Sequence, residues 1–124
     1  MPRTRVAIVA CMDARLGIET MFGLRAGDAH VIRNAGGCAT ADTLRSLRLS
    51  QIVGGTREIL LVHHEDCAAL AETGTDPDAD LRECVELVRT SNELPHTEMV
   101  RGFVYTRGGA LREIRPERRV ENPR

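Results

Sequence analysis

The chain has 124 residues, a length that predicts one domain over residues 1–124, with a polar tail at 115–124, and excludes two domains of ordinary size. Its net charge of -1 comes from acidic and basic residues scattered along the chain, which argues against nucleic-acid binding. All 17 basic residues are Arg, so Schiff-base and P-loop lysine chemistry are excluded. With no Trp, one Tyr and two Phe, the core must be mainly aliphatic, and such a core gains from a bound metal and from a second copy of the chain.

No feature of the sequence indicates export or a membrane. The longest apolar segments are too short to span a bilayer, and the apolar run at 6–10 is too short for a signal peptide. The four Cys residues therefore favour metal ligands or catalytic thiols over disulfides. We expect a cytoplasmic protein without a membrane partner.

Predicted strands and helices alternate through the first half of the chain. The strands are short apolar runs, and the helices carry apolar side chains at helical spacing with capping residues and glycines at their ends. The predicted elements are a strand at 6–10, a helix at 16–24, a strand at 29–33, a helix from Thr40 or Asp42 to Val53, and a strand at 58–62.

The second half opens with a polar stretch at 73–80, which the sequence predicts to be a loop. A helix follows, with one apolar face made by Leu81, Cys84, Val85 and Val88. A strand at 102–106 then turns at two glycines into an antiparallel strand at 110–114. The pattern predicts an α/β fold in which helices flank a mainly parallel sheet that ends in a C-terminal antiparallel strand.

Two motifs stand at the carboxyl ends of predicted strands. Cys11 follows the first strand, and His64-Glu-Asp-Cys67 follows the third. Ligand sites of open α/β sheets lie at this edge, so the motifs are expected to meet. Two thiols and an imidazole form a zinc ligand set with one corner open, as in catalytic zinc sites. The alternative is two buried apolar cysteines and a loop histidine, an arrangement without a metal.

His63 competes with His64 for the metal. Adjacent strand residues point to opposite faces, so only one of them can face the ion easily. The spacing of His64 and Cys67 lets both reach one ion from a tight turn, and we favour His64 as the ligand. His63 is then a packed or hydrogen-bonded neighbour.

Asp13 and Arg15 are two residues apart, so their side chains can reach the same side. Arg can grip a carboxylate through two parallel hydrogen bonds, which would keep Asp13 ionised and fixed. Beside Cys11, an ionised Asp13 can accept a proton in a hydrogen bond from a metal-bound hydroxide and orient it for attack. The alternative is an ordinary loop salt bridge.

The remaining candidates are weaker. Asn34-Ala-Gly-Gly37 is either a wall of the site or a plain turn. Cys38 and Cys84 are expected to be small buried apolar residues. His30 and His96 have no partner in sequence and are not expected to bind metal.

Three stretches together resemble the β-class carbonic anhydrases, in particular their short bacterial members. They are Ala10-Cys-Met-Asp-Ala-Arg15, Val31-Ile-Arg-Asn-Ala-Gly36 and Leu61-Val-His-His-Glu-Asp-Cys67, with Gly102-Phe-Val-Tyr105 as a further likeness to the family's late strand.

The resemblance implies reversible hydration of carbon dioxide to bicarbonate and a proton. It implies Zn²⁺ on Cys11, His64 and Cys67, with hydroxide as the fourth ligand, oriented by Asp13, which Arg15 holds. In many family members the aspartate can instead bind zinc, so Asp13 is also a conditional metal ligand. The family further implies a homodimer or a larger even oligomer.

Two other functions remain open. A related zinc hydrolase acting on carbonyl sulfide or carbon disulfide could share the zinc and the Asp–Arg pair. A zinc-stabilised module without catalysis is the alternative from another class. A thiol redox role is disfavoured because no Cys-x-x-Cys pair occurs.

Overall fold

A computed structural model describes residues 2–13, 15–37 and 39–114. Five strands form one sheet in the order β2-β1-β3-β4-β5. The first four are parallel neighbours and β5 runs antiparallel to β4, which confirms the predicted fold class. The strands are β1 (Val6–Cys11), β2 (Ala29–Asn34), β3 (Glu58–His64), β4 (Met99–Tyr105) and β5 (Leu111–Ile114).

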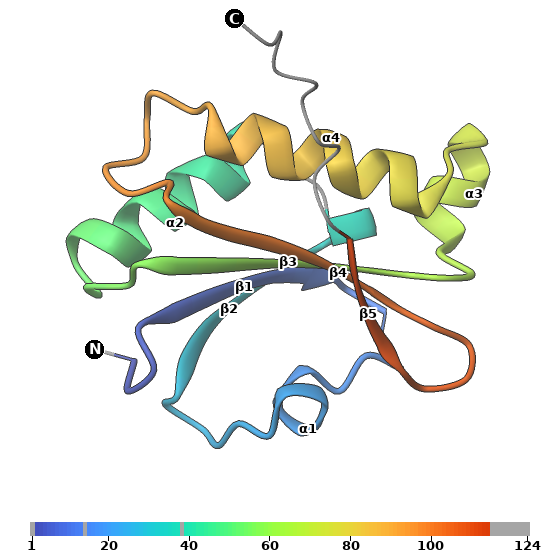
Figure 1. Cartoon of the computed structure of the whole chain (residues 1–124), viewed down its shortest axis with the longest axis horizontal. Coiled ribbons are helices and arrows are strands. Elements are labelled where there is room, and N and C mark those ends of the chain that lie inside the picture. Colours follow the sequence, from blue (N-terminus) through green and yellow to red (C-terminus); the bar gives the residue numbers. More distant parts are fainter. Residues whose placement is uncertain (1, 14, 38, 115–124) are drawn as a thin grey trace, which may run out of the picture.

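Helices cover both faces of the sheet. The helical elements are α1 (Ile18–Phe22), the single 3₁₀ turn η1 (Ala35–Gly37), α2 (Ala41–Ile52), α3 (Ala68–Thr73) and α4 (Pro77–Arg89). Figure 1 shows α2 and α4 over one face of the sheet, with α1 on the opposite face. Among the described residues, none of the helices has the length and apolar character needed to cross a bilayer.

The core is divided by the sheet into two apolar clusters, because successive strand residues point to opposite faces. On the α2 and α4 side, Val9, Ile59 and Leu61 pack with helical residues such as Leu47 and Val88. The opposite cluster contains Ile8, Ala10, Cys11, Ile18, Leu60, Val62, Cys67 and Leu70. The central strands β1 and β3 are therefore buried on both faces, as their continuous apolar runs predict.

The register of the parallel strands brings the two motifs to one edge. Cys11 is the last residue of β1 and pairs with Asn34, the last residue of β2. His64 ends β3 opposite Tyr105 of β4. The carboxyl ends of all four parallel strands therefore surround the position at which the motif residues meet.

The boundaries predicted in the third quarter of the chain were wrong. Part of the expected 73–80 loop is helical, because α4 begins at Pro77, with the Asp76 side chain accepting a hydrogen bond from the Ala79 amide at 3.0 Å. Proline suits the first helical position, so here it starts a helix. No pattern in the sequence indicated α3, and β3 extends past residue 62 to include His64. The predicted tail at 115–124 lies outside the described residues.

Candidate metal centre

Three donor atoms from distant parts of the sequence converge beyond the strand ends. The side-chain donor atoms of Cys11, His64 and Cys67 lie within 4.8 Å of one another, and all three residues are buried. The two sulfurs are 3.9 Å apart. Two sulfurs bound to one tetrahedral zinc, each at about 2.3 Å, would be about 3.8 Å apart. The pair therefore already has the spacing that a shared zinc ion requires.

His64 is prepared to bind through one particular ring nitrogen. Its Nδ1 lies 2.9 Å from the carbonyl oxygen of Glu65, which fixes Nδ1 as the donor. Its Nε2 is buried and has no hydrogen-bond partner among the described residues. Burial also holds the pKa of His64 below its usual value, so the ring is neutral at pH 7. A neutral imidazole with an unpartnered buried nitrogen fits the metal.

The 3₁₀ turn after β2 forms a wall of this centre. The Gly36 amide donates a hydrogen bond to Cys11 Sγ at 3.3 Å. Gly37 has φ +67, and a Cβ there would lie 3.0 Å from the Val62 carbonyl oxygen and 3.1 Å from the Cys11 amide. Glycine is needed both for this backbone conformation and for the close approach. The Asn34–Gly37 segment therefore packs directly against Cys11 and is not a plain turn.

Asp13 and Arg15 form the bidentate pair that the sequence suggests. Arg15 Nη2 lies 2.7 Å from Asp13 Oδ2, Nε contacts both oxygens at 3.1 and 3.2 Å, and the Arg15 amide donates to Oδ1 at 2.8 Å. These hydrogen bonds hold the pKa of Asp13 well below its usual range. Asp13 is not one of the residues whose donor atoms cluster with Cys11, and its carboxylate is paired with Arg15.

Arg33 supports the same loop, a role that its residue type and spacing did not predict. Its Nε and Nη2 donate to the carbonyl oxygens of Cys11 and Asp13 at 3.2 and 2.7 Å. The signal in the sequence was its position just before Asn34 in the second matching stretch. A side chain that binds backbone leaves no spacing pattern of its own, so only the structure could reveal this contact.

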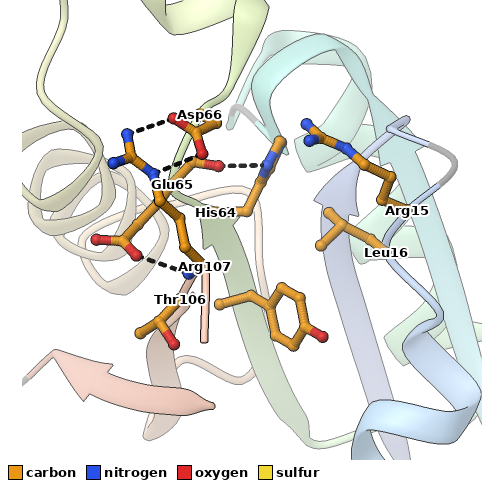
Figure 2. A pocket seen from close by; sticks show the side chains of 8 residues that line it. Arg15, Leu16, His64, Glu65, Asp66, Thr106 and Arg107 are labelled. Atoms are coloured by element: carbon orange, nitrogen blue, oxygen red, sulfur yellow. Dashed lines mark hydrogen bonds and ion pairs between the residues drawn. The ribbon is translucent and has the colours of Figure 1, made fainter. Parts of the chain in front are cut away.

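A cavity of about 150 Å³ opens beside His64, between Arg15 and the turn that joins β4 to β5. Figure 2 shows Arg107 reaching from that turn toward Glu65 and Asp66, with Arg15 on the other side of His64. The Arg107 amide donates to Glu65 Oε1 at 2.8 Å, and its guanidinium pairs with Asp66 through Nε at 2.6 Å and through Nη2. Asp66 has φ 62, so this ion pair fixes a backbone conformation uncommon for a residue other than glycine.

His63 lies on the other face of the sheet from His64. Its side chain is fully buried and its Nε2 is 2.6 Å from Asp80 Oδ2 of α4. Of the other minor candidates, Cys84 is buried on the apolar face of α4, His30 is hydrogen-bonded to Ser50 at 2.6 Å, and Cys38 lies outside the described residues.

Comparison with known proteins agrees with this geometry. The sequence model of the carbonic anhydrase family matches residues 6–105. β-Carbonic anhydrase 1 of Mycobacterium tuberculosis is 40% identical over 93% of this chain and 85% of its own length. The chain belongs to the β-carbonic anhydrase family.

Two further relatives show the range of this family. The crystal structure of the carbonic anhydrase from Streptococcus mutans matches this β-carbonic anhydrase fold with a TM-score of 0.83 and 36% identity, over 92% of this chain and 83% of the other. Carbon disulfide hydrolase of Acidianus is 44% identical over 72 residues, which are 58% of this chain and 35% of that protein.

Proposed function

We propose that this protein binds Zn²⁺ through Cys11, His64 and Cys67 and catalyses the reversible hydration of carbon dioxide to bicarbonate and a proton. The observation that carries the proposal is the convergence of two thiols and an unpartnered imidazole nitrogen beside an ionised Asp–Arg pair. Zinc in such a set lowers the pKa of a coordinated water to about 7 and supplies a nucleophile at neutral pH. Membership of the β-carbonic anhydrase family supports the same reaction.

Asp13 would orient the attacking water or hydroxide. Its carboxylate can only accept hydrogen bonds when ionised, so it would align the donor O–H and leave a lone pair free for the carbon atom. Arg15 would hold this carboxylate in place and keep it ionised. An Asp13 released by Arg15 could instead serve as a fourth metal ligand, which would close the site to substrate.

The deciding experiment is stopped-flow carbon dioxide hydration by metal-quantified protein between about pH 6.5 and 9, which brackets the expected titration of the coordinated water. The proposal expects one zinc per chain at this centre, activity that rises with pH, and inhibition by a zinc-binding anion. Full zinc occupancy without hydration at any pH would contradict the reaction and favour a zinc-stabilised, non-catalytic module.

A second candidate is hydrolysis of carbon disulfide or carbonyl sulfide. The stretch shared with carbon disulfide hydrolases supports it, although the match covers 35% of the Acidianus protein. Parallel assays with carbon dioxide, carbonyl sulfide and carbon disulfide would separate the candidates, because the preferred substrate has the highest kcat/KM.

We also propose self-association as a dimer or larger even oligomer in the cytoplasm. Leu49 of α2 and Val53, which follows the helix, are 40% and 77% exposed, and both line a groove of about 600 Å³ along the edge strand β2. Exposed apolar side chains grouped beside a sheet edge are suited to covering by a second copy.

A further inference from the structure

A second group of metal-type donors lies on the opposite face of the sheet from Cys11, His64 and Cys67. His63 points toward α4, because successive strand side chains alternate between faces. Asp80 and Cys84 lie one turn apart on α4, so both face the same way. The donor atoms of His63, Asp80 and Cys84 lie within 4.8 Å of one another.

The spacing of these donors is close to that of a tetrahedral site. Cys84 Sγ is 3.6 Å from Asp80 Oδ2, and a sulfur and an oxygen bound to one zinc would be about 3.5 Å apart. His63 Nε2 is 2.6 Å from the same oxygen, against about 3.3 Å for nitrogen and oxygen ligands of zinc. An ion that replaces the proton between His63 and Asp80 therefore requires these two atoms to move apart by about 0.7 Å.

The burial of these three residues suits a metal ion, because two donors are buried and the third is partly exposed. His63 is 0% exposed and Cys84 is 7% exposed, so two donors are fixed by packing between β3 and α4. The Asp80 side chain is 18% exposed, so the group reaches solvent at this donor. Thiolate and imidazole donors select zinc-type transition metals over magnesium or calcium.

We propose that His63, Asp80 and Cys84 form a second binding site for a zinc-type transition-metal ion. This site shares no ligand with the proposed catalytic centre and does not depend on the proposed function. An ion there would join α4 to the end of β3, directly behind His64, and would act as a structural clamp.

Metal stoichiometry tests the proposal on the full chain. Reduced, metal-stripped protein is titrated with Co²⁺ or Zn²⁺ against a competing chelator, with thiolate-to-cobalt absorption as a second readout. The wild-type protein should bind two ions per chain, and Cys84→Ser and Asp80→Asn should each bind one. The Cys84 variant should lose about one third of the thiolate-to-cobalt absorption, since one of three thiolates is removed.

Matched variants separate this site from the first. Asp78→Asn on the same helix should keep two ions, because Asp78 pairs with Arg112 and lies outside the cluster. Cys67→Ser should keep the second ion, and zinc should raise the melting temperature of Cys67→Ser but not of the Cys67→Ser/Cys84→Ser double variant. A single ion in wild-type protein that Cys84→Ser and Asp80→Asn leave in place would overturn the proposal and show a hydrogen-bonded network only. If wild-type protein binds only the ion that Cys84→Ser removes, and Cys67→Ser has no effect on metal binding, the proposed function is contradicted and the second site is not.

Discussion

Asp13 owes its chemical state to a neighbour two residues away. Three hydrogen bonds from the Arg15 side chain and one from its amide fix both carboxylate oxygens and lower the pKa. Such a group cannot titrate in the range in which carbon dioxide hydration would be assayed. Any rise of activity with pH near neutrality is therefore expected from the coordinated water and not from Asp13.

Replacing Asp13 tests its proposed role. Asp13→Asn should lower carbon dioxide hydration by roughly 10²-fold or more, because the neutral amide loses the ion pair and one acceptor oxygen. Metal content should stay the same, since the three proposed ligands are unchanged. Asp42→Asn, at an exposed position on α2, is the control and should keep full activity. An unchanged rate in metal-loaded Asp13→Asn would contradict the mechanism.

Gly37 offers a test of the wall behind Cys11. Gly37→Ala should lower the free energy of unfolding by roughly 1–3 kcal/mol, because it combines backbone strain with a close approach to two backbone atoms. Gly74→Ala is a matched control, since Gly74 has φ +70 but a Cβ added there would meet nothing within 4 Å. Denaturant unfolding should show a larger loss for Gly37→Ala than for Gly74→Ala; equal losses would mean that the close approach relaxes without cost.

At the scale of elements, the turn that carries the proposed ligands His64 and Cys67 is held by a neighbouring turn. Arg107, between β4 and β5, holds Glu65 and Asp66, the two residues between His64 and Cys67. It also holds the pKa of the Asp66 carboxyl below its usual value. The geometry of the turn between His64 and Cys67 is thus set partly by a hairpin that supplies none of the proposed ligands.

Arg107→Ala should therefore weaken zinc retention by roughly 10-fold, the scale found when groups behind metal ligands are removed. Competition with a chelator measures this effect. Arg101→Ala is the control, because it breaks an ion pair with Glu113 on the same sheet away from the ligand turn. Equal zinc affinities in the two variants would contradict the assigned role of Arg107.

Asp28 ties the N-terminal segment to the turn before β2. It accepts hydrogen bonds from the Arg25 amide at 2.8 Å and from Arg3 Nε at 2.7 Å, and these lower its pKa. A lowered folded-state pKa means that the stabilisation is present above the unfolded value of about 3.9 and is lost as pH falls through the folded value. Asp28→Asn should thus be less stable than wild-type protein at pH 7, and the difference should shrink as pH falls below about 4. Urea unfolding of both proteins between pH 7 and pH values below about 4 measures this difference in stability. A difference that grows on acidification would contradict the assigned role of the ionised Asp28.

At the scale of the whole molecule, several large apolar side chains stay exposed to solvent, among them Val53. Val53→Asp should shift the protein from an oligomeric to a single-chain mass in light scattering, because a charge in the proposed contact loses its hydration. Leu87→Asp is a suitable control, since Leu87 on α4 is also exposed, at 46%, but lies outside the groove. A single-chain mass for wild-type protein would contradict self-association itself.

The local pattern of the sequence was sufficient to predict most strands and the fold class, because apolar runs and glycine turns mark the buried strands directly. It failed at α3, which has only 6 residues, and at the start of α4, where the polar residues carry no apolar periodicity. Pro77 suggested a loop, although after the capping residue Asp76 it begins a helix. The boundaries that depend on caps were therefore the weakest part of the prediction.

The sequence by itself determined the donor types and the strand ends on which they stand, since Cys11, His64 and Cys67 follow recognisable apolar runs. The ion pair of Asp13 and Arg15 was also predictable, because the partners are two residues apart. Only the tertiary structure decided that Arg107 holds the ligand turn and that His63 meets Asp80 and Cys84 behind it. Those contacts join residues 17 to 42 positions apart, and such long-range contacts depend on register and helix packing, which no local sequence pattern encodes.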